Sequence, residues 1–301
     1  MNWRRVLIAD AALLGITFVW GTTFILVQNT LAKLSPLAFN SWRFLTATVL
    51  LMIWQIFHFK KSSSIHTPVY TRPLLMTGAI LGLFLFIGYL CQTIGLLYTT
   101  ASNAAFITGL SVVLVPIFSA LFLKKRPPLQ AVIGIIAASI GLFFLTTKGS
   151  FTFNRGDLIV FICAVAFALQ IVFTEKYTLQ FSSLPLTIIQ LGTVAVLSFT
   201  FGISLEGAKS ADWHTLMQPD VLLVILFMGL VATAAAFLLQ TILQKETPAT
   251  HVGIIYIMEP VFAALTSLVF QHMVLGSSEL IGSLFILFGM LLSEWPIKRL
   301  A

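Results

Sequence analysis

Charged residues are scarce in this sequence. Only 9% of its 301 residues are charged, against roughly 25% in soluble domains, while 58% are hydrophobic and the mean hydropathy is +1.01. This composition excludes a soluble globular domain and predicts a chain that lies in a lipid bilayer. The net charge is +7, and the basic residues are scattered between apolar runs. This distribution argues against a nucleic-acid partner. It indicates instead on which side of the membrane each connecting segment lies.

Groups that carry chemistry are also few. Cys91 and Cys163 lie inside apolar runs, where we expect them to pack as small residues rather than form a disulfide or bind a metal. The apolar runs hold no two acidic residues or histidines within helical reach, and neither Walker nor zinc-binding spacing occurs. We therefore expect no enzyme, no metal, no cofactor and no direct use of ATP.

Apolar runs of about 20 residues, the length that spans a bilayer as a helix, make up most of the chain. The first run follows Arg4-Arg5 without an Ala-x-Ala-like cleavage site, which indicates a retained span rather than a signal peptide. No period-two pattern indicates a barrel, so we predict an all-α polytopic membrane protein with ten transmembrane helices. The predicted spans are 6–27, 36–57, 74–97, 103–123, 129–147, 157–174, 184–205, 220–243, 249–270 and 278–297.

Lysine and arginine are unevenly shared between the two sides of these spans. Twelve fall on one side: Arg4, Arg5, Lys60, Lys61, Arg72, Lys124, Lys125, Arg126, Lys176, Lys245, Lys298 and Arg299. Four fall on the other, namely Lys33, Lys148, Arg155 and Lys209, while Arg43 lies within a span. Because basic residues stay in the cytoplasm, this distribution predicts a multi-pass protein of the inner or plasma membrane with both termini cytoplasmic.

The chain also contains an internal repeat. The matching segments are 89–94 with 237–242, 116–121 with 260–265, and the glycine pair Gly134 and Gly141 with Gly282 and Gly289. Residues 1–150 and 151–301 thus form two repeats of five spans each. Because five is odd, the second repeat must be inserted upside down, which is the architecture of secondary transporters with a substrate site between the halves.

Several short motifs occur in a fixed order along the ten spans. They are Trp20-Gly21-Thr22-Thr23-Phe24, Arg43-Phe44, Pro116, the Gly134 and Gly141 pair, and Glu259-Pro260. In this order they resemble the EamA repeats of the drug/metabolite transporter superfamily. The resemblance implies a ten-helix bundle that exchanges small metabolites, often amino acids or related compounds and often outward. The chain departs from the family after the fourth span, where Lys124-Lys125-Arg126-Pro127 replaces a frequent acidic residue.

Three ionisable residues lie inside predicted spans, where each costs a few kcal/mol and is a functional hypothesis. Asp10 is close to a helix N-terminus, which favours an anion, so we interpret it as structural. Arg43 either snorkels to the interface or points inward to hold a carboxylate. Glu259 stands near the middle of its span before Pro260, where it either binds a proton or substrate amine, or is a protonated acid bonded to a carbonyl.

Neutral polar and aromatic residues complete the predicted site. Most polar groups in spans hold helices together, but some of these also fit a cavity. The predicted cavity is lined by Trp20, Arg43, Gln92, Asn103, Gln170, Gln240 and Tyr256, with Glu259 as the coupling candidate.

These observations predict a secondary active transporter that works by alternating access. We expect an exporter of small metabolites such as amino acids, with protons as the candidate coupling ion. The alternative is a passive facilitator or uptake carrier for a small organic solute. The expected partners of the protein are the lipid bilayer and the substrate. The glycine pairs are also compatible with the contact face of a homodimer.

Overall fold

The computed structural model describes residues 3–61, 70–99, 101–147, 154–207, 213–270 and 276–294. Within these ranges the chain is helical and contains no strand, as predicted. Its elements are α1 (Trp3–Leu31), α2 (Pro36–Lys61), α3 (Arg72–Gly95), α4 (Ala101–Gly109), α5 (Ser111–Leu123), α6 (Leu129–Thr147), α7 (Arg155–Thr178), α8 (Ser183–Glu206), α9 (Trp213–Leu216), α10 (Pro219–Gly229), η2 (Leu230–Ala235), α11 (Ala236–Leu243), α12 (Ala249–Tyr256), α13 (Glu259–Phe270) and α14 (Ser277–Glu294).

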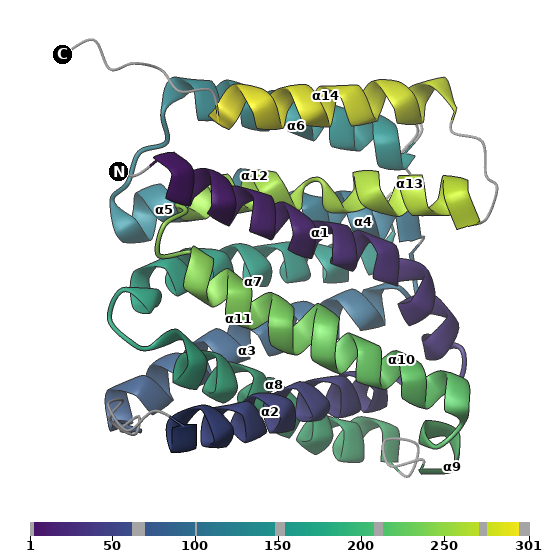
Figure 1. The fold of residues 1–301 in the computed structure, drawn as a ribbon. Coiled ribbons are helices and arrows are strands. Elements are labelled where there is room, and N and C mark those ends of the chain that lie inside the picture. The colour runs from purple at the N-terminus through teal and green to yellow at the C-terminus, as the bar shows by residue number, and fades with distance from the viewer. Residues whose placement is uncertain are drawn as a thin grey trace.

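The helices lie roughly side by side with their ends at two opposite faces (Figure 1). Seven helical stretches in the described part of the chain are long and apolar enough to cross a membrane. Shorter apolar stretches of 10–17 residues occur in α1, α6 and α14. The protein is therefore a polytopic helical membrane protein, while the number ten stays a prediction.

Three of the predicted spans are not single α-helices. The fourth divides into α4 and α5 at Leu110, and the ninth divides into α12 and α13 before Pro260. Proline has no backbone N–H to donate, so the turn before Pro260 cannot continue the α-helical hydrogen bonds. The eighth span, predicted as a helix over 220–243, is one helical stretch over Pro219–Leu243 that is apolar enough to cross a membrane. It contains the π-helical segment η2 between α10 and α11, which was not predicted.

The repeat-matched glycines lie against each other. A Cβ atom on Gly141 would stand 2.5 Å from the carbonyl oxygen of Gly282, and one on Gly289 would stand 2.4 Å from that of Gly134. Helices α6 and α14 therefore pack antiparallel with their backbones in close approach, and form one outer layer of the bundle (Figure 1). These glycines therefore serve helix packing within the chain, and a homodimer stays a prediction.

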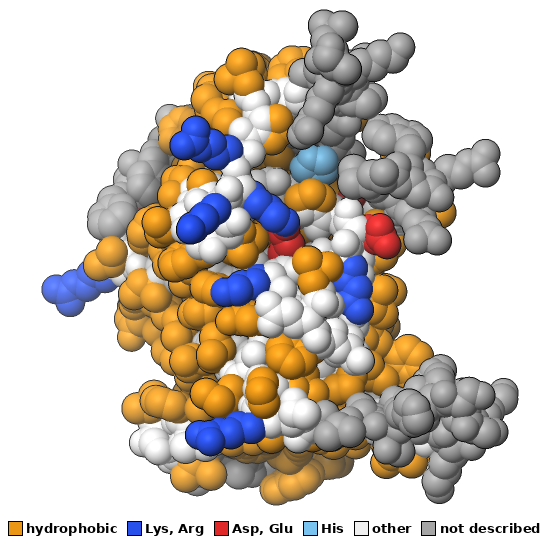
Figure 2. Space-filling model, turned by 90° about the vertical axis from the view of Figure 1, so that its left-hand side faces the viewer, with side chains coloured by type: hydrophobic (Ala, Val, Ile, Leu, Met, Phe, Trp, Pro, Cys, Tyr) orange, Lys and Arg blue, Asp and Glu red, His pale blue; other side chains and the backbone are white. Residues whose placement is uncertain are grey.

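One end of the bundle carries a group of basic side chains. The α5–α6, α7–α8 and α11–α12 connections all lie at the left of Figure 1, together with the start of α1. Figure 2 views this end and shows Lys and Arg side chains spread across it between hydrophobic ones. We refer to it as the basic end of the bundle. Lys148, Lys209, Lys298 and Arg299 lie outside the described residues.

Candidate functional site

The π-helical segment η2 supplies a backbone acceptor in the middle of a span. At its end the Ala236 N–H bonds to the carbonyl oxygen of Val231 rather than to that of Ala232. The shifted register deprives the Ala232 carbonyl of the donor that an α-helix would give it. The carbonyl instead accepts hydrogen bonds from Trp20 Nε1 at 2.8 Å and from Arg43 Nη2 at 3.4 Å. Thus η2 joins α1 and α2 at one point.

Arg43 lies at the centre of this arrangement. It is only 4% exposed, on α2 about two turns from the start of the helix. Its Nε donates to Thr233 Oγ1 at 2.6 Å and its Nη2 to the Tyr89 hydroxyl at 3.4 Å. The guanidinium also lies over the Tyr89 ring, 4.9 Å from the centroid. Arg43 therefore points inward and does not snorkel to the interface.

Among the described residues, the positive charge of Arg43 has only neutral hydrogen-bond partners. In the described part of the chain the two ion pairs are Lys33 with Asp220 and Lys125 with Glu175, and neither includes Arg43. Of the hydrogen bonds that Arg43 makes to described residues, none uses Nη1. The two N–H groups of Nη1 are thus available to a ligand. The planar guanidinium presents its N–H groups in a geometry that matches the two oxygens of a carboxylate.

An aromatic cluster surrounds Arg43. Trp20 packs edge-on against Tyr256 with centroids 5.0 Å apart and lies 5.5 Å from the Phe237 ring. Tyr89 in turn contacts Phe44 at 5.1 Å and Phe237 at 6.4 Å. These rings come from both repeats, so the cluster lies where the two repeats meet. It gives the site apolar walls that lower the local dielectric around the guanidinium.

Glu259 and Tyr256 flank the break between α12 and α13. Glu259 opens α13 and is partly buried, and no hydrogen bond from a described residue reaches its carboxylate. It interacts electrostatically with Arg43 without forming an ion pair. The Tyr256 hydroxyl is buried and also lacks a hydrogen-bond partner in the described part of the chain. Two polar groups thus remain unsatisfied beside the break.

Close backbone contact positions Glu259. A Cβ atom on Gly21 would lie 2.6 Å from the carbonyl oxygen of Glu259 and 2.7 Å from Cβ of Phe262. Only glycine therefore lets α1 approach the start of α13 this closely. The two neighbouring residues thus make different contacts. The Trp20 indole bonds to η2, and Gly21 lets α1 pack against the first turn of α13.

The remaining predicted site residues lie in other clusters. Gln170 and Gln240 are bonded to each other at 3.3 Å, and Gln240 also donates to Gln244 at 3.2 Å. Gln92 donates to Thr108 at 3.5 Å. The side chain of Asn103 lies outside the described residues. The structure therefore brings together Trp20, Arg43, Tyr256 and Glu259 of the predicted set.

The interpretation of the sequence missed part of this site. Ala232 and Thr233 sit in the middle of an apolar run that contains no proline, so no helix-breaking residue marked them. Phe237 could have been found, because it matches Tyr89 in the internal repeat 148 positions earlier and both rings contact the same cluster. Phe44 and Phe237 are both buried, with 0% and 3% exposed.

A second set of polar contacts closes the basic end. Asp10 accepts a hydrogen bond from the Thr247 hydroxyl at 3.1 Å. Glu175 accepts one from Lys125 and another from the backbone N–H of Ala249 at 2.7 Å. These contacts tie α1 and the end of α5 in the first repeat to α7 and α12 in the second. Asp10 thus has a structural contact, in line with its interpretation from the sequence.

The bundle of long apolar helices and its buried polar centre are those of a polytopic membrane protein. Residues 7–147 and 154–295 each match the model of the EamA-like transporter family. The chain therefore belongs to this family, as the resemblance of its motifs predicted, and is a membrane transporter.

Known relatives agree with this assignment over nearly the whole chain. An uncharacterized transporter of Archaeoglobus fulgidus is 31% identical over 291 residues, which cover 95% of this chain and 85% of that protein. The uncharacterized transporter YyaM of Bacillus subtilis is 26% identical over 299 residues, with 95% and 93% covered. A solved crystal structure matches with a TM-score of 0.74 over 97% of this chain and 99% of the other, at 17% identity, and shows the fold alone.

Proposed function

We propose that this transporter exports small metabolites that carry a carboxylate, such as amino acids or related compounds. Arg43 is the observation that carries the proposal. A buried guanidinium with neutral partners and two unused donors keeps a desolvated positive charge, which is costly unless an anion compensates it. A substrate carboxylate bonded to Nη1 supplies that anion.

Glu259 and Tyr256 suit the other end of such a substrate. Glu259 forms no ion pair with Arg43 in the structure, although the charge of Arg43 acts on its carboxylate. A zwitterion placed between them pairs its carboxylate with Arg43 and its ammonium group with Glu259. The aromatic rings of Trp20 and Phe237 then face the apolar part of the substrate.

The same geometry supports alternating access between two inverted halves. At the basic end the repeats are joined through Asp10 with Thr247 and through Lys125 with Glu175. At the opposite end they are joined by the Lys33–Asp220 ion pair and by hydrogen bonds to Glu206. We propose that these two sets open in turn around the central site, with the basic end in the cytoplasm.

Ligand-dependent thermal stability of the purified protein tests the carboxylate site. Single compounds from a panel of amino acids, their decarboxylated amines and simple carboxylates are added to wild-type protein and to Arg43→Gln. A ligand at about 100 times its Kd stabilises the folded state by about 2.7 kcal/mol. We expect stabilisation of the wild type by carboxylate compounds only, and none for Arg43→Gln. Equal stabilisation by the matched amines would contradict the proposal.

Flux measurements then test export. Metabolite profiles of the medium from overexpressing and deletion cells identify compounds that leave the cell through this protein. The compounds that stabilise the purified protein should accumulate outside the overexpressing cells and fall in the deletion cells. Accumulation inside the cells instead would indicate an uptake carrier. Equilibration that ignores an imposed pH gradient in proteoliposomes would indicate a passive facilitator.

A further inference from the structure

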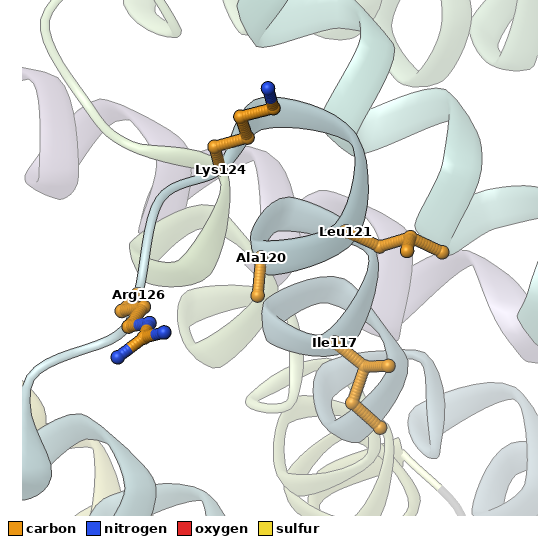
Figure 3. Close-up of a pocket in the computed structure, with 5 residues that line it drawn as sticks. All are labelled: Ile117, Ala120, Leu121, Lys124 and Arg126. Carbon is orange, nitrogen blue, oxygen red and sulfur yellow. The ribbon is translucent and has the colours of Figure 1, made fainter.

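A groove on the outside of the bundle lies between the last turns of α5 and the connection to α6. Its volume is about 630 Å³ and it is lined by Ile117, Ala120, Leu121, Lys124 and Arg126 (Figure 3). In Figure 3 the first three residues stand along α5, while Arg126 lies on the connection beside the helix. The groove lies at the basic end and is separate from the site around Arg43.

The wall formed by α5 is apolar and faces outward. Ile117 is 55% exposed and Leu121 is 66% exposed, whereas Ser119 is buried on the other side of the helix. Because α5 belongs to a stretch that is apolar enough to span the membrane, its outward face meets lipid chains rather than water. The wall therefore suits a hydrocarbon chain.

The rim of the groove is basic and its charges are not neutralised by the protein. Lys124 ends α5 in the left-handed conformation, with φ 55°, which turns the chain sharply toward Arg126. Lys125 between them bonds to Glu175 of α7. Lys124 and Arg126 form no ion pair with any described residue. Two exposed cations thus border an apolar groove at the boundary between hydrocarbon and headgroups.

We propose that this groove binds one anionic phospholipid of the leaflet at the basic end. Its phosphate contacts Lys124 and Arg126, and an acyl chain lies along Ile117 and Leu121. Charge complementarity selects the headgroup, because basic pockets at the ends of spans attract anionic lipids by about 1 kcal/mol per Lys or Arg. A zwitterionic lipid provides the same chains without the net negative charge. The basic sequence that departs from the family pattern thereby acquires a binding role.

Native mass spectrometry of the purified, delipidated full-length protein tests this site. The probes are phosphatidylglycerol and phosphatidylcholine with identical acyl chains. We expect a first phosphatidylglycerol to bind wild-type protein more tightly than phosphatidylcholine. The double variant Lys124→Gln and Arg126→Gln should weaken its binding about 30-fold. The single variant Lys124→Gln should weaken binding about fivefold, and it keeps the test informative if the double variant does not fold.

A matched control separates this groove from the general charge of the basic end. The double variant Arg72→Gln and Lys245→Gln removes one arginine and one lysine from the same end, at the start of α3 and after α11, and neither residue lines the groove. It should keep the wild-type affinity for the first phosphatidylglycerol. Equal weakening in both double variants would overturn the proposal, as would equal affinity for the two lipids. Displacement of the lipid by soluble glycerol phosphate at comparable concentration would also overturn it, because the apolar wall would then contribute nothing.

Discussion

Arg43 and Glu175 are equally buried, with 4% of each exposed, but their surroundings differ. Glu175 accepts hydrogen bonds from Lys125 and from the first backbone N–H of α12. Arg43 has neutral partners and an unused end of its guanidinium. At the basic end, the buried charge of Glu175 is therefore compensated within the protein. At the centre, the buried charge of Arg43 is not fully compensated.

This difference separates a structural role from a binding role. Removing a satisfied charge breaks contacts that hold the folded state, and lowers stability. Removing an unsatisfied charge takes away a desolvation cost, so the fold tolerates it while the ligand loses its partner. Variants at the two places should therefore affect different measurements.

The substitution Arg43→Gln should have the largest effect on transport. Loss of a hydrogen-bonded charge contact to the substrate costs about 1.5–3 kcal/mol, which corresponds to about 10- to 100-fold in substrate affinity. The midpoint of thermal unfolding without ligand should stay equal to that of the wild type or rise. Both are measured on the same purified protein, by flux into proteoliposomes and by thermal unfolding.

Arg43→Lys is the matched variant for this prediction. A lysine keeps the charge but cannot donate to Thr233, Tyr89 and Ala232 while also offering a fork to a carboxylate. We expect transport to stay low. Full transport by Arg43→Lys would show that only the charge matters. A large drop in thermal stability for Arg43→Gln would show that Arg43, like Glu175, has a structural role. The two regions would then not differ in the way proposed.

Gly21→Ala should alter the centre without changing any charge. The added Cβ would lie 2.6 Å from the carbonyl oxygen of Glu259, so α1 and α13 must separate. Overpacking of this kind costs about 1–3 kcal/mol, and transport should fall because Trp20 and Glu259 shift. Gly15→Ala on the same helix is the control, since its Cβ would meet nothing within 4 Å. Equal loss in both variants would mean that the added methyl group acts on α1 itself and not through the contact with α13.

Glu175→Ala should lower stability more than substrate binding. It removes the acceptor of the Ala249 N–H, and a buried donor left unpaired costs about 1–3 kcal/mol. Lys125→Ala should cost less than about 1 kcal/mol, because its side chain is 59% exposed. Thermal unfolding of both variants measures the difference. If Glu175→Ala had a normal unfolding midpoint but weakened ligand binding, Glu175 would have a binding role and not the structural role proposed here.

Several features of the fold and the site could be predicted from the sequence. The apolar runs revealed the helices, and Arg43 and Glu259 stood out because charge is rare in such runs. The segment η2 could not be predicted, because its shifted register depends on Trp20 and Arg43 competing for the Ala232 carbonyl from other helices. Nor could the sequence show which side of each helix faces the centre, so Gln170 and Gln240 were grouped with Arg43 although they bond to each other.

Glu259→Gln tests whether the carboxylate of the centre is used for coupling. An amide cannot gain or lose a proton, so the dependence of flux on pH should largely disappear while flux at the best pH falls by no more than about tenfold. The charged neighbour of Glu259 is Arg43, which stays in place. Flux with a normal rate and an unchanged pH profile in this variant, at normal expression, would exclude proton coupling through Glu259.

The smallest effect is expected from Thr233→Val, which removes only the acceptor of the Arg43 Nε–H at nearly constant volume. The guanidinium keeps its bonds to Tyr89 and Ala232 but loses its shortest one, so its orientation toward a carboxylate becomes less fixed. We expect substrate affinity to fall about fivefold, equivalent to about 1 kcal/mol. Thr241→Val is the control, because its hydroxyl bonds to Thr187 and the Phe237 carbonyl, away from Arg43. Equal losses of affinity in the two variants would show that the hydroxyl of Thr233 acts on helix packing. Only the Ala232 carbonyl of η2 would then remain to orient Arg43.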